Sequence, residues 1–138
     1  MIKITKERSV SIDDVLHLYQ AVGWTNYTNQ PQMLEQALSH SLATYLARDG
    51  EEIVGLVRLV GDGFSSVFVR DLIVLPSYQR QGIGSNLMKE ALADYKDAYQ
   101  IQLATEQTEK TLGFYRSLGF ETLSTYDCTG MIWVDRKK

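Results

Sequence analysis

The stretch VLPSYQRQGIGSNLM, residues 74–88, joins an apolar strand-like run to an amphipathic run through a short polar loop. Pro76 ends the apolar run, and Gly82 and Gly84 stand where a helix is predicted to begin. A helix N-terminus has unpaired backbone N–H groups and a partial positive charge, so it favours anions. Glycines allow a close approach to the backbone and a positive φ, and Arg80 adds a cation beside them. The stretch therefore predicts a strand–loop–helix junction suited to a pyrophosphate.

Two familiar phosphate-binding loops do not fit this junction. The sequence GIGSN lacks the third glycine of the dinucleotide fingerprint, and no acidic residue ends a strand about 20 residues later. It also lacks the lysine that a P-loop requires. Two glycines before a helix can equally form a tight turn and nothing more, so the flanking sequence has to distinguish these alternatives.

The segments on both sides of the junction are periodic. Residues 66–75 form a strand-like run, and residues 82–95 predict a helix with one apolar face. Asp49 and Gly50 predict a tight hairpin turn within the β-rich residues 42–60. The other predicted elements are a strand at 2–5, a helix capped by Ser11 and ended by Gly23, a helix from Pro31 to Leu42, a strand at 99–105, a short helix within 108–120, and a closing hairpin of strands at 121–126 and 131–134.

This order of elements predicts the α/β (α+β) class. We expect a single domain over residues 1–138, in which a mixed sheet of about six to seven strands is flanked on both faces by about four helices. No internal repeat or low-complexity tract interrupts the chain.

Composition limits the partners and the location. The net charge of −3 argues against nucleic-acid binding, which needs a basic surface. Cys128 is the only cysteine and has no metal-ligand spacing around it, so we expect a reducing cytoplasm, no disulfide and no metal. We also expect Cys128 to be a small buried apolar group. No apolar run of about 18 residues occurs, so neither secretion nor membrane insertion is expected.

Two motifs resemble those of the GNAT superfamily of acyl-CoA-dependent N-acetyltransferases. QRQGIG, residues 79–84, matches the family's Q/R-x-x-G-x-G/A signature and follows DLIVLPSY, which looks like the family's central strand. Further downstream GFYRSLGF, residues 113–120, is similar to the second signature, a short helix that carries FY and ends in GF. The motifs cover residues 71–120, and the resemblance in element order extends over the whole chain. It implies a mixed, mostly antiparallel sheet.

The resemblance implies that acetyl-CoA binds as a cosubstrate. By the family pattern, backbone groups of the central strand bind the pantetheine arm, and the amides of the glycine loop, together with an arginine, hold the pyrophosphate. The residues implied are Leu72, Ile73, Val74, Gln79, Arg80, Gln81, Gly82, Ile83, Gly84 and Ser85.

Acetyl transfer to an amine needs a proton donor for the departing thiolate. The resemblance implies that Tyr115, in the FY motif, is this general acid. A phenol with a pKa near 10 is reasonably matched to a thiolate whose conjugate acid has a pKa near 8.5. The alternative is that Tyr115 packs with Phe114 and Leu118 and its hydroxyl reaches water.

The same reaction needs a proton acceptor for the amine. Asp71 on the central strand and Glu106 after the next strand are two candidates for the general base. Asp71 could instead pair with Arg70 or Arg58, Glu106 could be a solvated loop carboxylate, and water could carry the proton. Strand alternation predicts that Asp71 shares a face with Val69, whereas Arg70 lies on the other face.

Two further places bear on ligand contacts. Many relatives carry an asparagine and an alanine where this chain has Thr108 and Thr111, so the resemblance does not carry over a contact to CoA at these two positions. In the loop at residues 22–30, Trp24 and Tyr27 either wall the substrate pocket or cap the core.

These features predict an enzyme that transfers the acetyl group of acetyl-CoA to a primary amine by direct attack in a ternary complex. A small-molecule acceptor is expected; a protein N-terminus or lysine is the alternative within the same chemistry. A second alternative is an acetyl-CoA-binding regulatory module without turnover. The apolar segment TGMIWVD, residues 129–135, makes a homodimer possible.

Overall fold

The computed structural model describes residues 1–135. The chain divides into two compact units, Met1–Leu103 and a second unit that begins at Ala104. The first unit contains β1 (Ile2–Glu7), α1 (Ile12–Ala21), α2 (Thr25–Thr28), α3 (Pro31–Ser39), β2 (Ala43–Asp49), β3 (Glu52–Gly61), β4 (Ser66–Val74), the 3-10 helix η1 (Pro76–Tyr78), α4 (Ile83–Asp94) and β5 (Gln100–Leu103). The second contains α5 (Glu109–Ser117) and the 3-10 helix η2 (Leu123–Tyr126).

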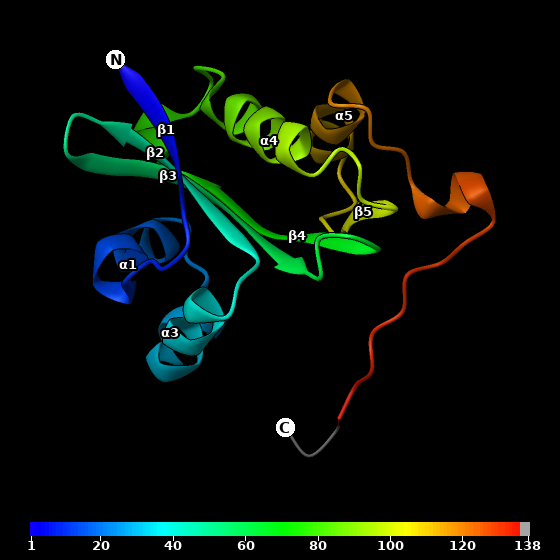
Figure 1. The fold of residues 1–138 in the computed structure, drawn as a ribbon, viewed down its shortest axis with the longest axis horizontal. Coiled ribbons are helices and arrows are strands. Elements are labelled where there is room, and N and C mark those ends of the chain that lie inside the picture. Colours follow the sequence, from blue (N-terminus) through cyan, green and yellow to red (C-terminus); the bar gives the residue numbers. More distant parts are fainter. Residues whose placement is uncertain (136–138) are drawn as a thin grey trace. The chain divides into compact units, whose positions relative to one another are not determined.

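The first unit is built on one five-stranded sheet with the order β1-β2-β3-β4-β5 (Figure 1). The pairs β1–β2, β2–β3 and β3–β4 are antiparallel, and β4–β5 is parallel. A mixed, mostly antiparallel sheet in an α+β fold is therefore confirmed. Because α4 connects the two parallel strands, it crosses over one face of the sheet, as a parallel connection requires.

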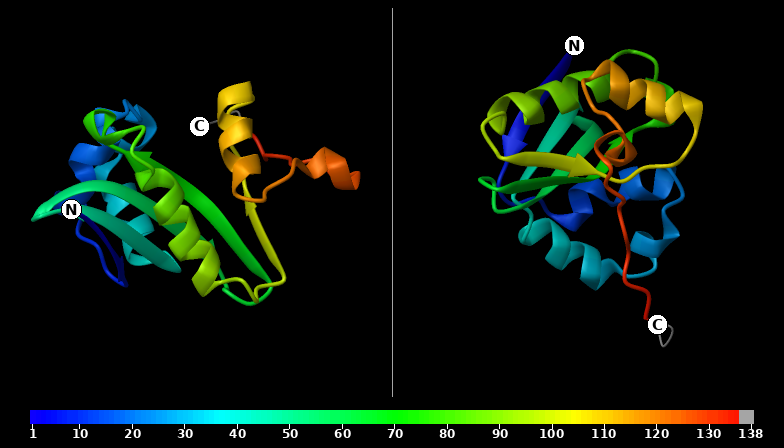
Figure 2. Two further views of the ribbon diagram at one scale, coloured as in Figure 1. Left: turned by 90° about the horizontal axis from the view of Figure 1, so that it is seen from above. Right: turned by 90° about the vertical axis from the view of Figure 1, so that its right-hand side faces the viewer.

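Helices cover both faces of this sheet. The helices α1 and α3 lie on one face and α4 lies on the other, as the two further views show (Figure 2). On the α1 face the core includes Leu18, Leu34, Leu56 and Ile73, all at most 2% exposed. Burying such side chains stabilises the fold by about 1.5–3 kcal/mol each, so this cluster contributes substantially to holding α1 and α3 on the sheet.

Local signals in the sequence start and end several helices as predicted. Ser11 caps α1, because its side-chain oxygen accepts a hydrogen bond from the backbone N–H of Asp13. Pro31 is the first residue of α3, where its missing N–H has no consequence. Gly50 adopts a φ of 62° in the turn between β2 and β3, as the predicted hairpin requires.

The predicted closing hairpin is wrong. Residues 123–126 form a 3-10 helix, and residues 131–134 are not in a strand, so the sheet has five strands rather than six to seven. An alternating apolar pattern makes a strand only where another strand supplies hydrogen bonds, and that partner is not visible in local sequence. Cys128, expected to be buried, is exposed in the same region.

The count of helices also differs, since residues 1–135 contain five α-helices where about four were expected. The additional one is α2, a single turn within the segment that was predicted to be a loop. A four-residue helix is too short to show an apolar period, so sequence periodicity could not have found it. No helix within residues 1–135 has both the length and the apolar character needed to cross a bilayer.

The strand β4 contains a bulge at Arg70. Arg58 of β3 faces Asp71 of β4, and the next residue, Leu59, faces Val69, so Arg70 is an extra residue without a partner of its own. Cross-strand partners share a face and successive residues of β3 alternate, so Asp71 and Val69 lie on opposite faces. The prediction that they share a face is therefore wrong, because the bulge shifts the alternation by one residue.

Candidate functional site

The loop between β4 and α4 contains two residues with positive φ and leads into a helix start without a side-chain cap. Arg80 and Gly82 have φ values of 66° and 80°, in the left-handed region. Arg80 is the less usual of the two, since only glycine adopts such a φ without strain. The helix α4 begins at Ile83, and no side chain caps it. Its first N–H groups are therefore available to a ligand.

Gly82 leaves open space above the loop. A Cβ atom built at Gly82 would meet no protein atom within 4 Å. The side chain of the next residue, Ile83, is buried and fixes the start of α4 against the sheet. A ligand can thus approach the backbone at Gly82, whereas the helix behind it is held firmly.

Two side chains of the loop bind back to the sheet. The Tyr78 hydroxyl donates to the carboxylate of Asp49 at 2.7 Å and lies 3.3 Å from that of Glu52. The hydrogen bond to Asp49 raises the pKa of Tyr78 to about 12. The Gln79 side-chain amide donates to the backbone carbonyl of Val74 at 3.0 Å. Gln79, predicted to contact the cofactor, thus holds the loop to the end of β4.

The second half of β4 has one open edge. The strand pairs with β5 only at residues 66–69, but it pairs with β3 as far as Val74. Along residues 70–74, the backbone groups that point away from β3 therefore have no strand beside them. Leu72 and Val74, among the predicted pantetheine contacts, lie on this stretch and are half-buried. The open edge runs directly into the glycine loop.

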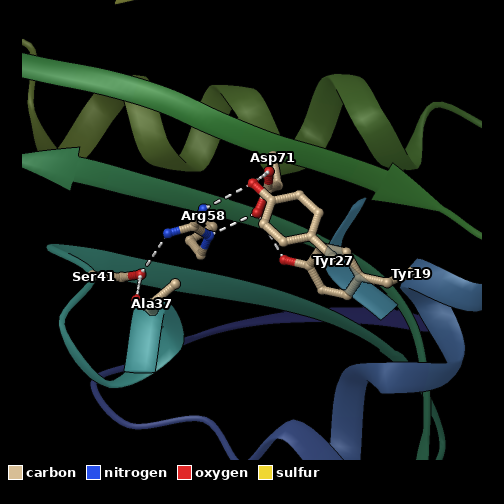
Figure 3. A network of polar contacts seen from close by, with 6 residues as sticks. All are labelled: Tyr19, Tyr27, Ala37, Ser41, Arg58 and Asp71. Carbon is tan, nitrogen blue, oxygen red and sulfur yellow. Dashed lines mark hydrogen bonds and ion pairs between the residues drawn. The ribbon is translucent and has the colours of Figure 1, made fainter. Parts of the chain in front are cut away.

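Asp71 does not face this opening, because it belongs to a buried network (Figure 3). Its carboxylate accepts hydrogen bonds from Arg58 Nε at 2.6 Å, from the Tyr19 hydroxyl at 2.8 Å and from the Tyr27 hydroxyl at 2.8 Å. Asp71 is 2% exposed and Arg58 is 4% exposed. A carboxylate that is buried and already held by three side chains is poorly placed to contact a substrate amine. Of the alternatives for Asp71, the structure has the ion pair with Arg58.

The network keeps its tyrosines protonated. Burial, and then the charge and hydrogen bond of Asp71, raise the pKa of Tyr19 and of Tyr27. Burial alone would lower the pKa of Arg58, but the charge and hydrogen bond of Asp71 outweigh burial and raise it. The stability that the two hydroxyls contribute is present at neutral pH. It is lost only as the pH rises beyond the ordinary tyrosine pKa of about 10 toward the raised values.

The predicted substrate-binding aromatics pack into the core. Tyr27 is 6% exposed, and its hydroxyl is used by Asp71 and by Arg58. Trp24 is half-buried and packs edge-on against Tyr19, with ring centroids 6.1 Å apart. Of the two alternatives for these aromatics, the described contacts are those of core packing.

The second unit carries the predicted acid. Tyr115 lies on α5, and its ring packs against Phe114 and Phe120 with centroids 5.0 and 5.9 Å apart. Burial raises the pKa of its phenol, which therefore stays protonated at neutral pH. Glu106 is exposed in the segment before α5.

The two threonines that depart from the family pattern form the cap of α5. The Thr108 hydroxyl oxygen accepts from the backbone N–H of Thr111 at 3.1 Å and lies 2.8 Å from the Thr111 hydroxyl. Thr108 therefore has a structural role at the helix start, because it satisfies one of the otherwise unpaired N–H groups.

Sequence reasoning missed that the hydroxyls of Tyr19 and Tyr27 complete the buried network. Tyr19 lies within the predicted helix that Ser11 caps and Gly23 ends, and nothing near it in the sequence indicates a partner for its hydroxyl. One signal was available: Arg58 lies inside the otherwise apolar run IVGLVRLV, and a buried cation needs a partner. No group of three or more His, Cys, Asp or Glu side chains able to hold a metal ion occurs among residues 1–135.

Comparison with known proteins extends these observations. Residues 40–122 match the family described as "Acetyltransferase (GNAT) domain". The solved structure of a GNAT-family acetyltransferase from Streptococcus pneumoniae TIGR4 is 74% identical, covers 99% of both chains and has a TM-score of 0.91.

Two more distant relatives have names that state a reaction or a bound ligand of their own. The chain is 33% identical over 95 residues to chloroplastic serotonin N-acetyltransferase 2 of Oryza sativa subsp. japonica; the match covers 66% of this chain but only 48% of that protein. The solved structure of a GNAT-family acetyltransferase from Elizabethkingia anophelis with acetyl-CoA bound is 23% identical, covers 87% of this chain and 76% of that one, and has a TM-score of 0.64. At this identity the second likeness concerns the fold alone.

Proposed function

The chain belongs to the GNAT family of acetyltransferases, and from this premise we propose that it transfers the acetyl group of acetyl-CoA to a small primary amine. The observation that carries the proposal is the continuity of two features of the first unit. The open edge of β4 leads into a glycine loop whose helix start has no side-chain cap. Together they match an extended arm that ends in a pyrophosphate.

In this proposal the first unit binds the cosubstrate. Backbone groups of Leu72, Ile73 and Val74 hydrogen-bond the pantetheine arm as an added strand would. The N–H groups of residues 81–85 receive the pyrophosphate, and Arg80, whose side chain is exposed, supplies a cation. The empty space at Gly82 supports this assignment, since a phosphate could approach the backbone there without meeting protein atoms.

The proposed transfer is a direct attack in a ternary complex. The amine lone pair attacks the thioester carbonyl carbon, the carbon–sulfur bond breaks, and the thiolate takes a proton from the Tyr115 hydroxyl. Because burial raises the pKa of Tyr115, its hydroxyl is protonated at neutral pH and carries the proton when the thiolate forms. Backbone N–H groups on the open edge of β4 are suitable donors to the developing oxyanion.

The base in this proposal is Glu106 or water. The buried ion pair argues against Asp71, because its carboxylate is 2% exposed and occupied by Arg58 and two tyrosines. Glu106 is exposed and has the freedom to accept a proton from a bound amine or from a water molecule between them.

A small acceptor is favoured by the name of the rice relative. That name specifies serotonin, a small primary amine, as the substrate of the plant enzyme. For this chain we propose only the class of acceptor, small primary amines, and no individual amine.

The proposal is tested by measuring CoA thiol release with acetyl-CoA and a panel of amines. The panel contains arylalkylamines, polyamines, amino acids, a peptide with a free N-terminus and a peptide with an internal lysine. We expect acceptor-dependent thiol release with one class of small amines and none with the peptides. Tight acetyl-CoA binding without release on any acceptor would contradict the enzyme and support a regulatory module.

A homodimer is part of the proposal. In the second unit the neighbouring apolar residues Met131, Ile132 and Val134 are 95%, 86% and 68% exposed, and a contiguous exposed apolar patch often marks an interaction site. A second copy of the chain is the partner that we propose for this segment.

Replacing Ile132 with aspartate should make the protein monomeric, because a charge would be buried in the proposed interface. Light scattering after size exclusion should give a dimer mass for the wild type and a monomer mass for Ile132→Asp. The matched control is Phe64→Asp, which changes an apolar residue that is 84% exposed in the first unit and should leave the dimer intact. A monomeric wild type at all concentrations would remove the dimer from the proposal.

A further inference from the structure

The buried network on β3 and β4 is completely satisfied. Besides binding Asp71, Arg58 donates from Nη2 to the Tyr27 hydroxyl at 3.2 Å and from Nη1 to the Ser41 hydroxyl at 3.2 Å. Ser41 in turn donates to the backbone carbonyl of Ala37 at 2.6 Å. Among the described residues no buried side-chain nitrogen or oxygen lacks a partner. The network thus connects α1, α2 and the end of α3 to the middle of the sheet (Figure 3).

The network lies at the point where the strands separate. The pairing of β4 with β5 ends at Val69, Arg70 is the bulge residue, and Asp71 follows it directly. A bulge locally disrupts the hydrogen-bond ladder and redirects the backbone beside it. The residue after this bulge is fixed by three hydrogen bonds from three different elements.

A buried ion pair is weak evidence of a role in stability. Removing two charges from water offsets most of the attraction between them, so apolar residues of similar volume often give an equally stable core. Hydrogen bonds, however, fix both the distance and the direction between two groups, whereas apolar contacts are not directional. The charged and hydroxyl groups of this network therefore indicate a role in fixing the geometry of the β4 backbone beside the bulge.

We infer that Arg58, Asp71, Tyr19 and Tyr27 are positioning residues for acetyl transfer. They hold the bulge at Arg70, and with it the backbone of β4 on which the thioester would lie. Through Tyr27 they also hold α2 against the same point of the strand. This inference rests on the proposed function, since it assigns the network to the geometry of that transfer and not to binding of the cosubstrate.

The first test removes one hydroxyl at a time. Tyr19→Phe and Tyr27→Phe should each lower kcat about 10- to 100-fold, because a small displacement of reacting groups has a large effect on rate. The affinity for acetyl-CoA should change less than twofold. The control is Tyr45→Phe: Tyr45 is 1% exposed, and its hydroxyl donates to Asp94 at 2.6 Å, but this bond does not involve β4. That variant should keep the wild-type kcat.

The second test separates positioning from stability. The fourfold apolar variant Tyr19→Phe, Tyr27→Phe, Arg58→Met, Asp71→Leu should unfold within a few degrees of the wild type yet have at least 10-fold lower kcat. A stable fourfold variant with wild-type kcat would overturn the inference, as would single variants indistinguishable from Tyr45→Phe. If the fourfold variant does not fold, the kcat values of Tyr19→Phe and Tyr27→Phe, compared with that of Tyr45→Phe, decide whether the inference holds.

A readout without turnover distinguishes failure of this inference from failure of the proposed function. In 15N-labelled protein, Tyr27→Phe should shift or broaden the amide resonances of Arg70, Asp71 and Leu72, and Tyr45→Phe should leave them unchanged. Unchanged resonances in both variants would overturn the inference. Shifted resonances in a protein that releases no CoA thiol on any amine would instead contradict the proposed function alone.

Discussion

Replacing Gly82 with aspartate is expected to lower the affinity for acetyl-CoA at least 100-fold, about 2.8 kcal/mol, while the fold remains intact. The new carboxylate would occupy the space that is open above the loop and would repel the pyrophosphate there. Because a Cβ at Gly82 meets no protein atom within 4 Å, the change does not disturb the packing of α4. Isothermal titration calorimetry with acetyl-CoA measures the loss directly.

Two controls separate charge from backbone strain. Asparagine has nearly the same size as aspartate and tolerates the left-handed region about as well, but it carries no charge. The variant Gly82→Asn should therefore retain more of the affinity for acetyl-CoA than Gly82→Asp. Gly50→Asp introduces the same residue at a glycine with a φ of 62° and equally open surroundings, but in the turn between β2 and β3. It should lose a similar amount of thermal stability and bind acetyl-CoA normally. Wild-type affinity in Gly82→Asp would contradict the assignment of the pyrophosphate to this loop.

Replacing Tyr115 with phenylalanine is expected to lower turnover about 10- to 1000-fold, with nearly constant affinity for acetyl-CoA. The phenol donates a proton only when the thiolate departs, so its loss affects kcat and not binding. Steady-state kinetics with the best acceptor amine, together with calorimetry, measures both quantities. Tyr99→Phe is the control, since Tyr99 is 81% exposed in the first unit.

The pH dependence of turnover in the wild type and in Tyr115→Phe tests whether the Tyr115 proton takes part in the reaction. Burial raises the pKa of Tyr115 above its ordinary value of about 10, so the wild-type enzyme should lose turnover only as the pH rises above about 10. Phenylalanine has no proton to lose, so the variant should lack this alkaline decline. An unchanged kcat, or the same alkaline decline in both proteins, would leave Tyr115 with the packing role alone.

The strand–loop–helix junction at residues 74–88 could be predicted from local sequence, because the residues that determine it lie within the stretch itself. A proline, two glycines and an apolar period fix where β4 ends and α4 begins, and the positive φ at Gly82 follows from the same residues. The same is true of the hairpin turn at Gly50 and of the start of α3 at Pro31.

Asp71 shows where the sequence was insufficient. Its three partners, Tyr19, Tyr27 and Arg58, lie 52, 44 and 13 positions away in the chain. No pattern near Asp71 indicates that these groups meet, and two of them occupy positions that serve equally well as apolar packing. The sequence therefore allows two roles for this carboxylate, base or ion-pair partner, and only the fold shows that it pairs with Arg58.

The sequence by itself determined the elements whose signals lie within a few residues: the periodic helices, the glycine loop and the family motifs around them. Tertiary structure alone decided three things: the bulge at Arg70, the burial of Asp71 among distant hydroxyls, and the absence of the closing strands from the sheet of residues 1–135. The physical reason is the same in each case. A bulge, a buried charge and an added strand are all settled by hydrogen-bond partners, and those partners are distant in the chain.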